Sequence, residues 1–262
     1  MIKSSKYVKK IRSTNVYDVA NKSPITKAEG LSLQYGNNIL LKREDMQPVF
    51  SFKLRGAYNK LSKLNKKGRN KSVIAASAGN HAQGVAFASL KLGLKATIVM
   101  PVTTPSIKID SVKRFGAKII LSGDNFDEAF KFAKEMSKKK KATFIHPYDD
   151  PDVIAGQGTI GMEIIEALDE DVDAIFVPVG GGGLLAGVGA YIKSINPKIK
   201  IYGVEPEDAA CLDAAVKANK RVSLKEVGLF ADGVAVKQIG KTTYSLIEEW
   251  IDGVVTVSVD EI

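Results

Sequence analysis

Residues 51–59 read Ser51-Phe52-Lys53-Leu54-Arg55-Gly56-Ala57-Tyr58-Asn59, and they place Lys53 at the start of a predicted helix. Most lysines at such a position are solvated surface charges, and this chain is rich in them. The surroundings of Lys53 are different because they are apolar, with Pro48, Val49, Phe50 and Phe52 close in sequence. Burial disfavours the charged ammonium form and lowers the pKa of a lysine, which leaves a nucleophilic amine. We therefore predict that Lys53 is the reactive residue.

A second motif is Ser77-Ala78-Gly79-Asn80-His81-Ala82-Gln83-Gly84. It follows an apolar stretch at 72–76 that reads as a strand, and it leads into a helical pattern at 80–91. The first amide groups of a helix have no partners within the helix, so such a turn can bind an anion. A turn that only caps the helix is the compatible alternative, because serine and asparagine are good caps.

A third motif is the four-glycine loop Gly180–Gly183, which is followed by Leu184. It lies between a predicted strand at 174–179 and a predicted helix, and glycines let the backbone approach a phosphate closely. One alternative is a tight turn that needs glycines for its geometry, although four exceed what a turn requires. Another is a dinucleotide site of the G-x-G-x-x-[G/A] type, with Glu205 after the next strand. That site would leave Lys53 without a role.

Composition excludes several classes of protein. The 262 residues carry a net charge of +9, but the lysines are scattered, and their cluster at Lys138–Lys141 lacks the interleaved aromatic residues of a nucleic-acid binder. The single cysteine, Cys211, precludes an internal disulfide and fits a reducing compartment, so we expect a cytoplasmic protein. The N-terminus lacks a secretory signal, and no apolar run is long enough to span a membrane. With only His81 and His146 as histidines, we expect no metal site.

Short apolar runs alternate with helical patterns along the chain, which predicts an α/β fold with largely parallel sheets. The expected strands lie at residues 39–41, 72–76, 96–100, 118–121, 142–145, 174–179, 199–204 and 254–257.

The three motifs, in this order, resemble those of the pyridoxal-phosphate enzymes of the tryptophan synthase β-subunit fold type. The run from Lys42 to Asn59 is most similar to the threonine dehydratase (threonine ammonia-lyase) family, and the resemblance extends from Tyr17 to the end of the chain. It implies two open-sheet α/β domains, with the smaller one inserted in the larger. The small domain would span residues 51–146, and the large domain residues 1–50 and 147–262. The cofactor would lie between them.

The resemblance also implies roles for individual residues. Lys53 would hold pyridoxal 5'-phosphate covalently and then act as the catalytic base at the substrate α-carbon. The other cofactor-binding residues would be Phe52, Asn80, Gly180, Gly181, Gly182, Gly183, Leu184 and Gly233. The carboxylate of the amino-acid substrate would be bound by Ser77, Gly79, Asn80 and His81, largely through backbone amides.

The implied reaction is the deamination of L-threonine to 2-oxobutanoate and ammonia, the first step of isoleucine biosynthesis. L-Serine would be a side substrate, because a pocket discriminates one methyl group by only about 1–3 kcal/mol. Serine dehydratase, serine racemase and threonine synthase are neighbouring families, and a nicotinamide-dependent oxidoreductase is the alternative for the glycine loop. The family further implies a homo-oligomer, a dimer or a tetramer.

The chain departs from the family pattern in two places. It stops at Ile262, where the family continues with a helix, a Pro-Ser-Gly-Ala segment whose serine binds the pyridine nitrogen, and in some members a regulatory domain. We therefore expect a C-terminally truncated catalytic domain, and a non-catalytic or partner-binding fragment is the alternative. Glu205 lies near the position where related racemases hold a divalent cation, but Cys211 replaces a further acidic ligand.

Overall fold

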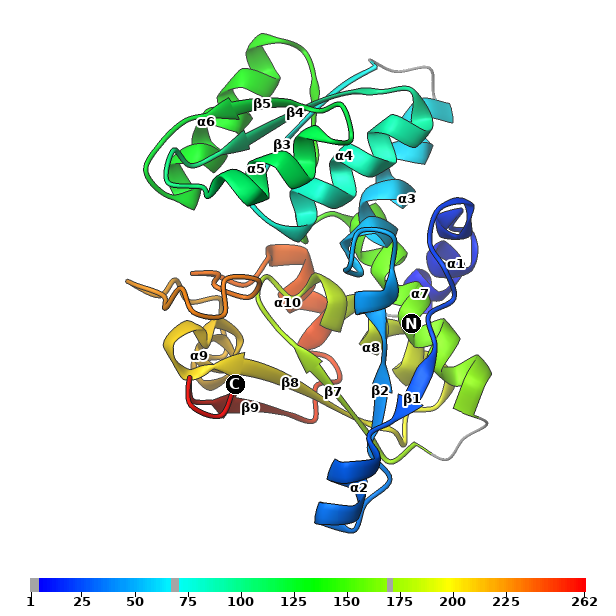
Figure 1. Cartoon of the computed structure of the whole chain (residues 1–262). Coiled ribbons are helices and arrows are strands. Elements are labelled where there is room, and N and C mark those ends of the chain that lie inside the picture. The colour runs from blue at the N-terminus through cyan, green and yellow to red at the C-terminus, as the bar shows by residue number, and fades with distance from the viewer. Residues whose placement is uncertain (1–4, 67–70, 169–171) are drawn as a thin grey trace.

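The computed structural model describes residues 5–66, 71–168 and 172–262. Within these ranges the strands form three sheets: a two-stranded hairpin, a four-stranded sheet and a three-stranded sheet. The two larger sheets lie in separate halves of the molecule, one above the other in Figure 1. This arrangement confirms the predicted α/β fold with parallel sheets.

The four-stranded sheet is parallel and has the order β5-β4-β3-β6. Its strands are β3 (Ser72–Ala76), β4 (Lys95–Met100), β5 (Lys118–Leu121) and β6 (Thr143–Phe144). The helices that connect them are α4 (Asn80–Leu92), α5 (Ser106–Lys113) and α6 (Phe126–Lys139). Strands β3 and β4 are almost fully buried, as expected for the centre of a parallel sheet covered on both faces.

The three-stranded sheet, β7-β8-β9, is also parallel. It contains β7 (Ala174–Pro178), β8 (Lys200–Pro206) and β9 (Gly253–Val257). Four helices accompany it: α7 (Pro151–Leu168), α8 (Gly183–Ile195), α9 (Cys211–Ala218) and α10 (Lys241–Ile247). The largest apolar core lies between this sheet and the helices α1 (Ser5–Arg12), α7 and α8.

Helix α3 (Lys53–Lys66) connects the two halves, because it packs both on α4 and on α7. The contact with α7 is close: a Cβ on Gly156 would lie 2.5 Å from the carbonyl oxygen of Arg55 and 2.6 Å from the Cα of Gly56. The amide of Gly56 also donates a hydrogen bond of 3.1 Å to Oε1 of Gln157. The start of α3, which carries Lys53, is therefore fixed to the helix that follows the four-stranded sheet in the chain.

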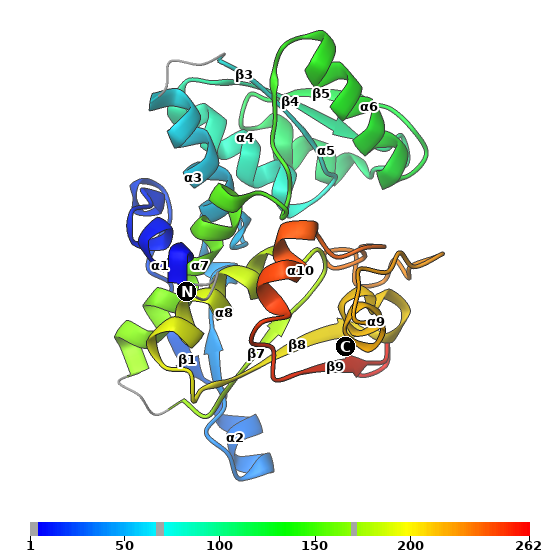
Figure 2. The same cartoon turned by 180° about the vertical axis from the view of Figure 1, so that it is seen from behind.

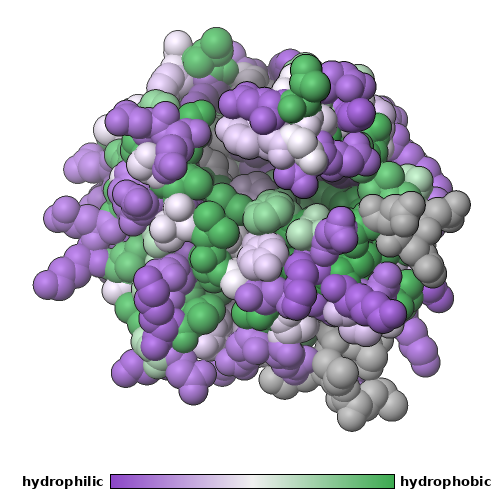
Figure 3. Space-filling view, turned by 90° about the horizontal axis from the view of Figure 1, so that it is seen from below, coloured by the Kyte–Doolittle hydropathy of each residue, from purple (hydrophilic) through white to green (hydrophobic). Residues whose placement is uncertain are grey.

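The N-terminal part of the chain forms β1 (Ile25–Lys27), α2 (Glu29–Tyr35) and β2 (Leu40–Lys42), and β1 pairs with β2 in antiparallel fashion. This hairpin extends below the larger core in Figures 1 and 2. Apolar side chains interrupt the hydrophilic surface that is seen from below in Figure 3. The exposed apolar residues of the hairpin are Leu31, Leu33, Tyr35 and Leu41.

All the predicted strands are present, with ends shifted by at most two residues. Strand β1 was not predicted because Ile25-Thr26-Lys27 contains one apolar residue and its signal is its pairing with β2. Its pairing with β2 depends on the turn through α2, which ends at Gly36 in the left-handed conformation. Among the described residues, no helix is both long and apolar enough to cross a membrane.

Candidate active site

Lys53 is the first residue of α3, and its side chain is half-buried. Burial lowers the pKa of its amine from 10.5 to about 8. The amine lies 5.2 Å from the centre of the Phe52 ring, which itself packs against the larger core. Of the four apolar residues that the sequence places close to Lys53, Phe52 lies beside its amine, whereas Phe50 is 69% exposed.

Helix α4, which belongs to the four-stranded sheet, packs closely against the backbone of Lys53. A Cβ on Gly84 would lie 3.0 Å from the carbonyl carbon of Lys53 and 3.1 Å from the amide nitrogen of Leu54. Gly84 is the last residue of the second sequence motif, but nothing in the sequence shows that it contacts the first. The contact brings the two motifs together at the start of α3.

The second motif forms the turn between β3 and α4. Gly79 is the N-cap of α4 and Asn80 its first residue, while the hydroxyl of Ser77 accepts a hydrogen bond of 3.2 Å from the Gly79 amide. No side chain caps α4, so the interpretation of this turn as a side-chain cap is wrong. The amides at this helix start have no helical partner, and the side chain of Asn80 is exposed.

His81 is buried at the base of this turn. Its Nε2 donates a hydrogen bond of 3.1 Å to the carbonyl oxygen of Ile145, a residue directly after β6. Burial, and secondarily the charge of Lys53, lowers the pKa of His81 to about 3, so the imidazole is neutral. The ring therefore anchors α4 to β6, and only the backbone amide of His81 is free for the predicted substrate contact.

The four-glycine loop joins β7 to α8, and each of its glycines has a reason in the packing. Gly182 has a φ of +84°, a conformation that favours glycine. A Cβ on Gly181 would enter the ring of Tyr148, and one on Gly183 would lie 2.9 Å from the Cβ of Tyr148. A Cβ on Gly180 would lie 3.0 Å from the Cα of Val234. The packing of the loop by itself therefore accounts for all four glycines.

Tyr148 packs against the glycine loop and against the ring of His146. The two rings are 4.7 Å apart, and Nδ1 of His146 accepts hydrogen bonds from the amides of Tyr148 (3.3 Å) and Asp149 (2.9 Å). Burial lowers the pKa of His146 to about 4, and the charge of Lys53 makes a smaller contribution in the same direction. Nothing in the sequence distinguishes Tyr148, whose role is visible only in the folded chain.

Gly233 lies in an irregular segment beside the loop, and a Cβ placed on it would have no neighbour within 4 Å. Two ion pairs attach this segment to the helices of the four-stranded sheet: Lys108 with Asp232, and Lys237 with Asp127 at 3.2 Å. A cavity of about 620 Å³ lies between the same segment and the start of α6. Its walls include Tyr148 but not Lys53, Asn80 or the glycine loop.

Glu205 is completely buried at the end of β8. Its carboxylate accepts hydrogen bonds of 2.9 Å from the amides of both Leu212 and Asp213, at the start of α9. Burial raises its pKa to about 7, although these hydrogen bonds act in the opposite direction. The Cys211 thiol donates to the carbonyl oxygen of Gly180 at 3.4 Å. Among the described residues, no three His, Cys, Asp or Glu side chains are grouped to hold a metal ion.

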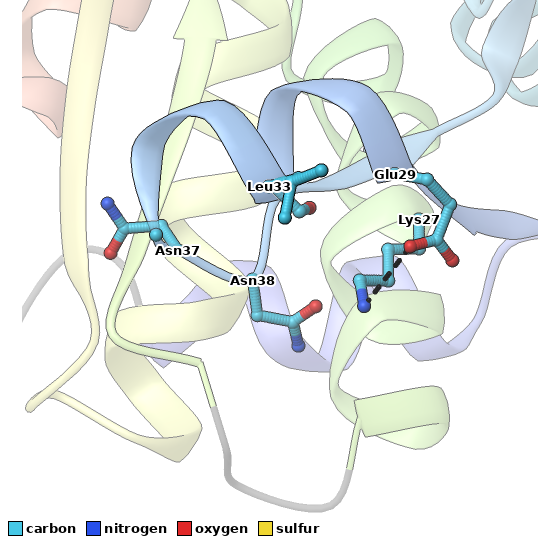
Figure 4. A pocket seen from close by; sticks show the side chains of 7 residues that line it. Lys27, Glu29, Leu33, Asn37 and Asn38 are labelled. Atoms are coloured by element: carbon cyan, nitrogen blue, oxygen red, sulfur yellow. Dashed lines mark ion pairs between the residues drawn. The ribbon is translucent and has the colours of Figure 1, made fainter.

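A second cavity, of about 530 Å³, lies beside α2 (Figure 4). Lys27 and Glu29 form an ion pair of 3.3 Å at its edge, and Leu33, Asn37 and Asn38 also line it. None of the predicted cofactor- or substrate-binding residues contributes to its walls. This cavity is therefore separate from the residues predicted from sequence, which lie at the starts of α3, α4 and α8 and, for Gly233, in the irregular segment.

Known proteins share this arrangement. Residues 16–262 match the family model described as "Pyridoxal-phosphate dependent enzyme". The chain is 57% identical over 256 residues to threonine dehydratase 1 biosynthetic, chloroplastic, of Solanum lycopersicum, and covers 42% of that protein. It is 51% identical over 258 residues to the biosynthetic L-threonine dehydratase of Escherichia coli, of which it covers 50%. The chain spans about half the length of these curated relatives.

Solved structures show the same fold. The processed form of threonine deaminase isoform 2 from Solanum lycopersicum matches with a TM-score of 0.94 and 52% identity, over 97% of this chain and 70% of that chain. A second threonine deaminase, from T.th., matches with a TM-score of 0.90 and 35% identity, over 98% of this chain and 82% of that chain. Maize serine racemase has a TM-score of 0.90 at 31% identity, over 97% and 76% of the two chains.

Proposed function

Because this chain belongs to the family of pyridoxal-phosphate dependent enzymes, we propose that it deaminates L-threonine to 2-oxobutanoate and ammonia. The observation that carries the proposal is Lys53, a half-buried lysine at the start of α3 whose pKa is lowered to about 8 by burial. Such an amine is partly neutral at physiological pH and can attack an aldehyde. The similarity to biosynthetic threonine dehydratases supports the choice of substrate.

The residues present fit the cofactor. Lys53 offers the amine for covalent attachment, and the Phe52 ring lies beside it. The start of α8 offers backbone amides and the positive end of a 13-residue helix for a phosphate, with no Cβ on the preceding glycines. We propose that Gly180–Gly183 and Leu184 bind the phosphate, and that Asn80 and Gly233 contact the rest of the cofactor.

The cofactor, when bound, supplies an electron sink for negative charge that develops at the substrate α-carbon. Lys53 would hold the cofactor, and its free amine would take the α-proton of the substrate at Nζ. The low pKa suits this role because general bases work best when their pKa is near the operating pH. The nearby imidazoles do not compete for the proton, since burial lowers the pKa of His81 to about 3 and that of His146 to about 4.

The turn before α4 is the proposed site for the substrate carboxylate. The backbone amides of Asn80 and His81 lie at the start of a 13-residue helix, where an anion is stabilised. The predicted contact of the Gly79 amide would require it to leave the Ser77 hydroxyl. Ser77 stabilises the turn because its hydroxyl accepts a hydrogen bond from the Gly79 amide. The same hydroxyl is a further possible donor to the substrate carboxylate. L-Serine has the same carboxylate and amine as L-threonine, so we expect it to be a slower side substrate.

The positions of the sheets support the proposed domain division. The strands of the four-stranded sheet, from β3 to β6, fall inside residues 51–146, and those of the other two sheets fall outside. A dimeric or tetrameric assembly and a role in isoleucine biosynthesis are proposed by analogy with the family. The cytoplasmic location also stays a proposal, because relatives from plants and yeasts are named chloroplastic or mitochondrial.

The purified chain, supplied with pyridoxal phosphate and L-threonine, tests the proposal directly. We expect 2-oxobutanoate to form, and borohydride reduction followed by peptide mapping to place the cofactor on Lys53. Lys53→Ala should lose both signals. The control Lys60→Ala, on the same helix, should keep them, since Lys60 pairs instead with Asp150 at 2.7 Å.

Three outcomes would contradict parts of the proposal. Attachment at Lys53 without 2-oxobutanoate would exclude the activity of this chain and favour a fragment that binds the cofactor without turnover. Attachment at another lysine would refute the role of Lys53. A nicotinamide-type absorbance in place of the pyridoxal phosphate spectrum would favour the oxidoreductase alternative.

A further inference from the structure

The side chain of Arg55 is a fully buried cation two residues after Lys53. Its guanidinium forms paired hydrogen bonds with Glu44, from Nε to Oε2 and from Nη2 to Oε1, both at 2.8 Å. It also forms two with Glu163, from Nη1 to Oε1 at 2.5 Å and from Nη2 to Oε2 at 3.1 Å. The Thr159 hydroxyl and the Asn21 carbonyl accept two further bonds, at 3.0 and 3.1 Å. Every donor nitrogen of Arg55 is therefore engaged.

The charges around Arg55 balance. Lys42 contributes a second cation, 2.6 Å from Oε2 of Glu163, so two basic groups face two carboxylates. The phenol of Tyr17 donates to Oε1 of Glu163 at 2.9 Å. Burial would raise the pKa of Glu163, but the hydrogen bonds and charges of Arg55 and Lys42 outweigh it and hold the pKa below its usual range. The Glu163 carboxylate is thus held between two cations.

This cluster joins segments that are far apart in sequence. Glu44 lies in the short 3-10 helix after β2, Asn21 in the N-terminal segment and Glu163 in α7. A planar guanidinium held by two carboxylates in paired hydrogen bonds is fixed in orientation as well as in position. A lysine in this buried place could not form the paired hydrogen bonds.

The position of Arg55 on α3 gives the cluster a consequence for Lys53. Successive residues of a helix are separated by about 100°, so side chains two positions apart leave it on nearly opposite sides. Holding Arg55 therefore sets the rotation of α3 about its axis and with it the direction in which Lys53 projects. A rotated α3 would take the guanidinium away from the buried Glu163, which would keep Lys42 as its cation, and the loss of one partner from a buried ion cluster is unfavourable.

We propose that Arg55 is a positioning residue for Lys53: its double carboxylate clamp fixes the rotation of α3 and so aims the lysine amine into the site. The inference rests on the proposed role of Lys53 as the attachment residue. It assigns a function to an ion cluster that does not itself contact the glycine loop or the turn before α4. A solely structural cluster would affect the melting temperature without changing the reactivity of Lys53 in the folded chain.

The test measures the attachment of pyridoxal phosphate to Lys53 in the full chain, by borohydride trapping and peptide mapping, below the melting temperature of each variant. Arg55→Lys keeps the charge but cannot form the paired hydrogen bonds. We expect its trapping rate at Lys53 at pH 7.5 to fall at least tenfold, and the pH midpoint of trapping to rise. Lys60→Ala, which removes an ion pair elsewhere on α3, should stay within twofold of the unmodified chain.

A decrease smaller than tenfold in folded Arg55→Lys would overturn the inference. If Arg55→Lys does not fold, Glu44→Gln is the variant that tests the inference. Glu44 lies at the edge of the cluster, and the amide of the substituted glutamine keeps one acceptor for Arg55. A decrease of threefold or more supports the proposal, and a smaller one contradicts it. Absence of trapping at Lys53 in the unmodified chain would refute the proposed function itself, which distinguishes the two failures.

Discussion

The two strand-to-helix turns of the candidate site are alike in sequence character but differ in their surroundings. The turn between β3 and α4 is open: a Cβ placed on Gly79 would have no neighbour within 4 Å. The turn between β7 and α8 is packed, because a Cβ on Gly181 would enter the ring of Tyr148 and Gly182 requires a positive φ. One turn leaves space for a ligand, and the other is held in a fixed shape.

This difference separates two meanings of a glycine in a binding turn. In the open turn, a substitution would act on the ligand and leave the fold intact. In the packed turn, it would disturb the fold before any ligand is considered. We therefore expect substitutions in the open turn to affect binding and substitutions in the packed turn to affect stability.

The largest expected effect concerns the amine of Lys53, next to the helix that follows the open turn. Burial lowers its pKa from 10.5 to about 8, so at pH 7 its neutral fraction exceeds that of an ordinary lysine by roughly 300-fold. Its labelling by acetic anhydride should reach half of its maximum near pH 8. The exposed Lys139 serves as the comparison within the same chain. Equal pH profiles for the two lysines would show that Lys53 is not desolvated.

The same shift predicts a dependence of stability on pH. Between pH 8 and 10.5 the unfolded chain holds the Lys53 proton more tightly than the folded chain, so the folded state gains stability as the pH rises. Urea unfolding should show this gain across the window in the unmodified chain. It should be missing in Lys53→Met, and the same gain in both proteins would contradict the assignment.

Gly181→Ala should be the most destabilising substitution at the packed turn. The new methyl group would overlap the ring of Tyr148, and overpacking of this kind costs about 3 kcal/mol. Denaturant unfolding measures the loss. The double variant Gly181→Ala/Tyr148→Ala should lose much less stability than the sum of the losses in the two single variants, because the clash is removed. Strict additivity would show that the ring moves away at little cost.

Gly84→Ala should have an intermediate effect of about 1–2 kcal/mol, since the neighbouring atoms belong to the backbone of Lys53 and Leu54 and cannot swing away. The control is Gly30→Ala in α2, which meets nothing within 4 Å and should stabilise the chain by about 0.5–1 kcal/mol. Trapping of pyridoxal phosphate at Lys53 should slow in the first variant only. Unchanged stability and trapping in Gly84→Ala would mean that α4 does not hold the lysine.

These contacts show which parts of the site a sequence can reveal. Lys53 could be singled out because apolar residues flank it in the sequence, and the two turns were predictable because glycines follow apolar strands. Tyr148 and Gly84 were not, since their partners lie 33 and 31 residues away in sequence (Tyr148 to Gly181, Lys53 to Gly84). The short strand β1 was missed for the same reason, because its only signal is its pairing with β2.

Gly79→Ala should have the smallest effect on stability and the most selective effect on binding. The free space around Gly79 predicts a loss of stability well below that of Gly181→Ala. The methyl group would, however, point into the space where the substrate carboxylate is proposed to bind. We expect the KM for L-threonine to rise about tenfold, which corresponds to about 1.4 kcal/mol, while pyridoxal phosphate trapping at Lys53 stays unchanged. A loss of stability comparable to that of Gly181→Ala would remove the distinction between the open and the packed turn.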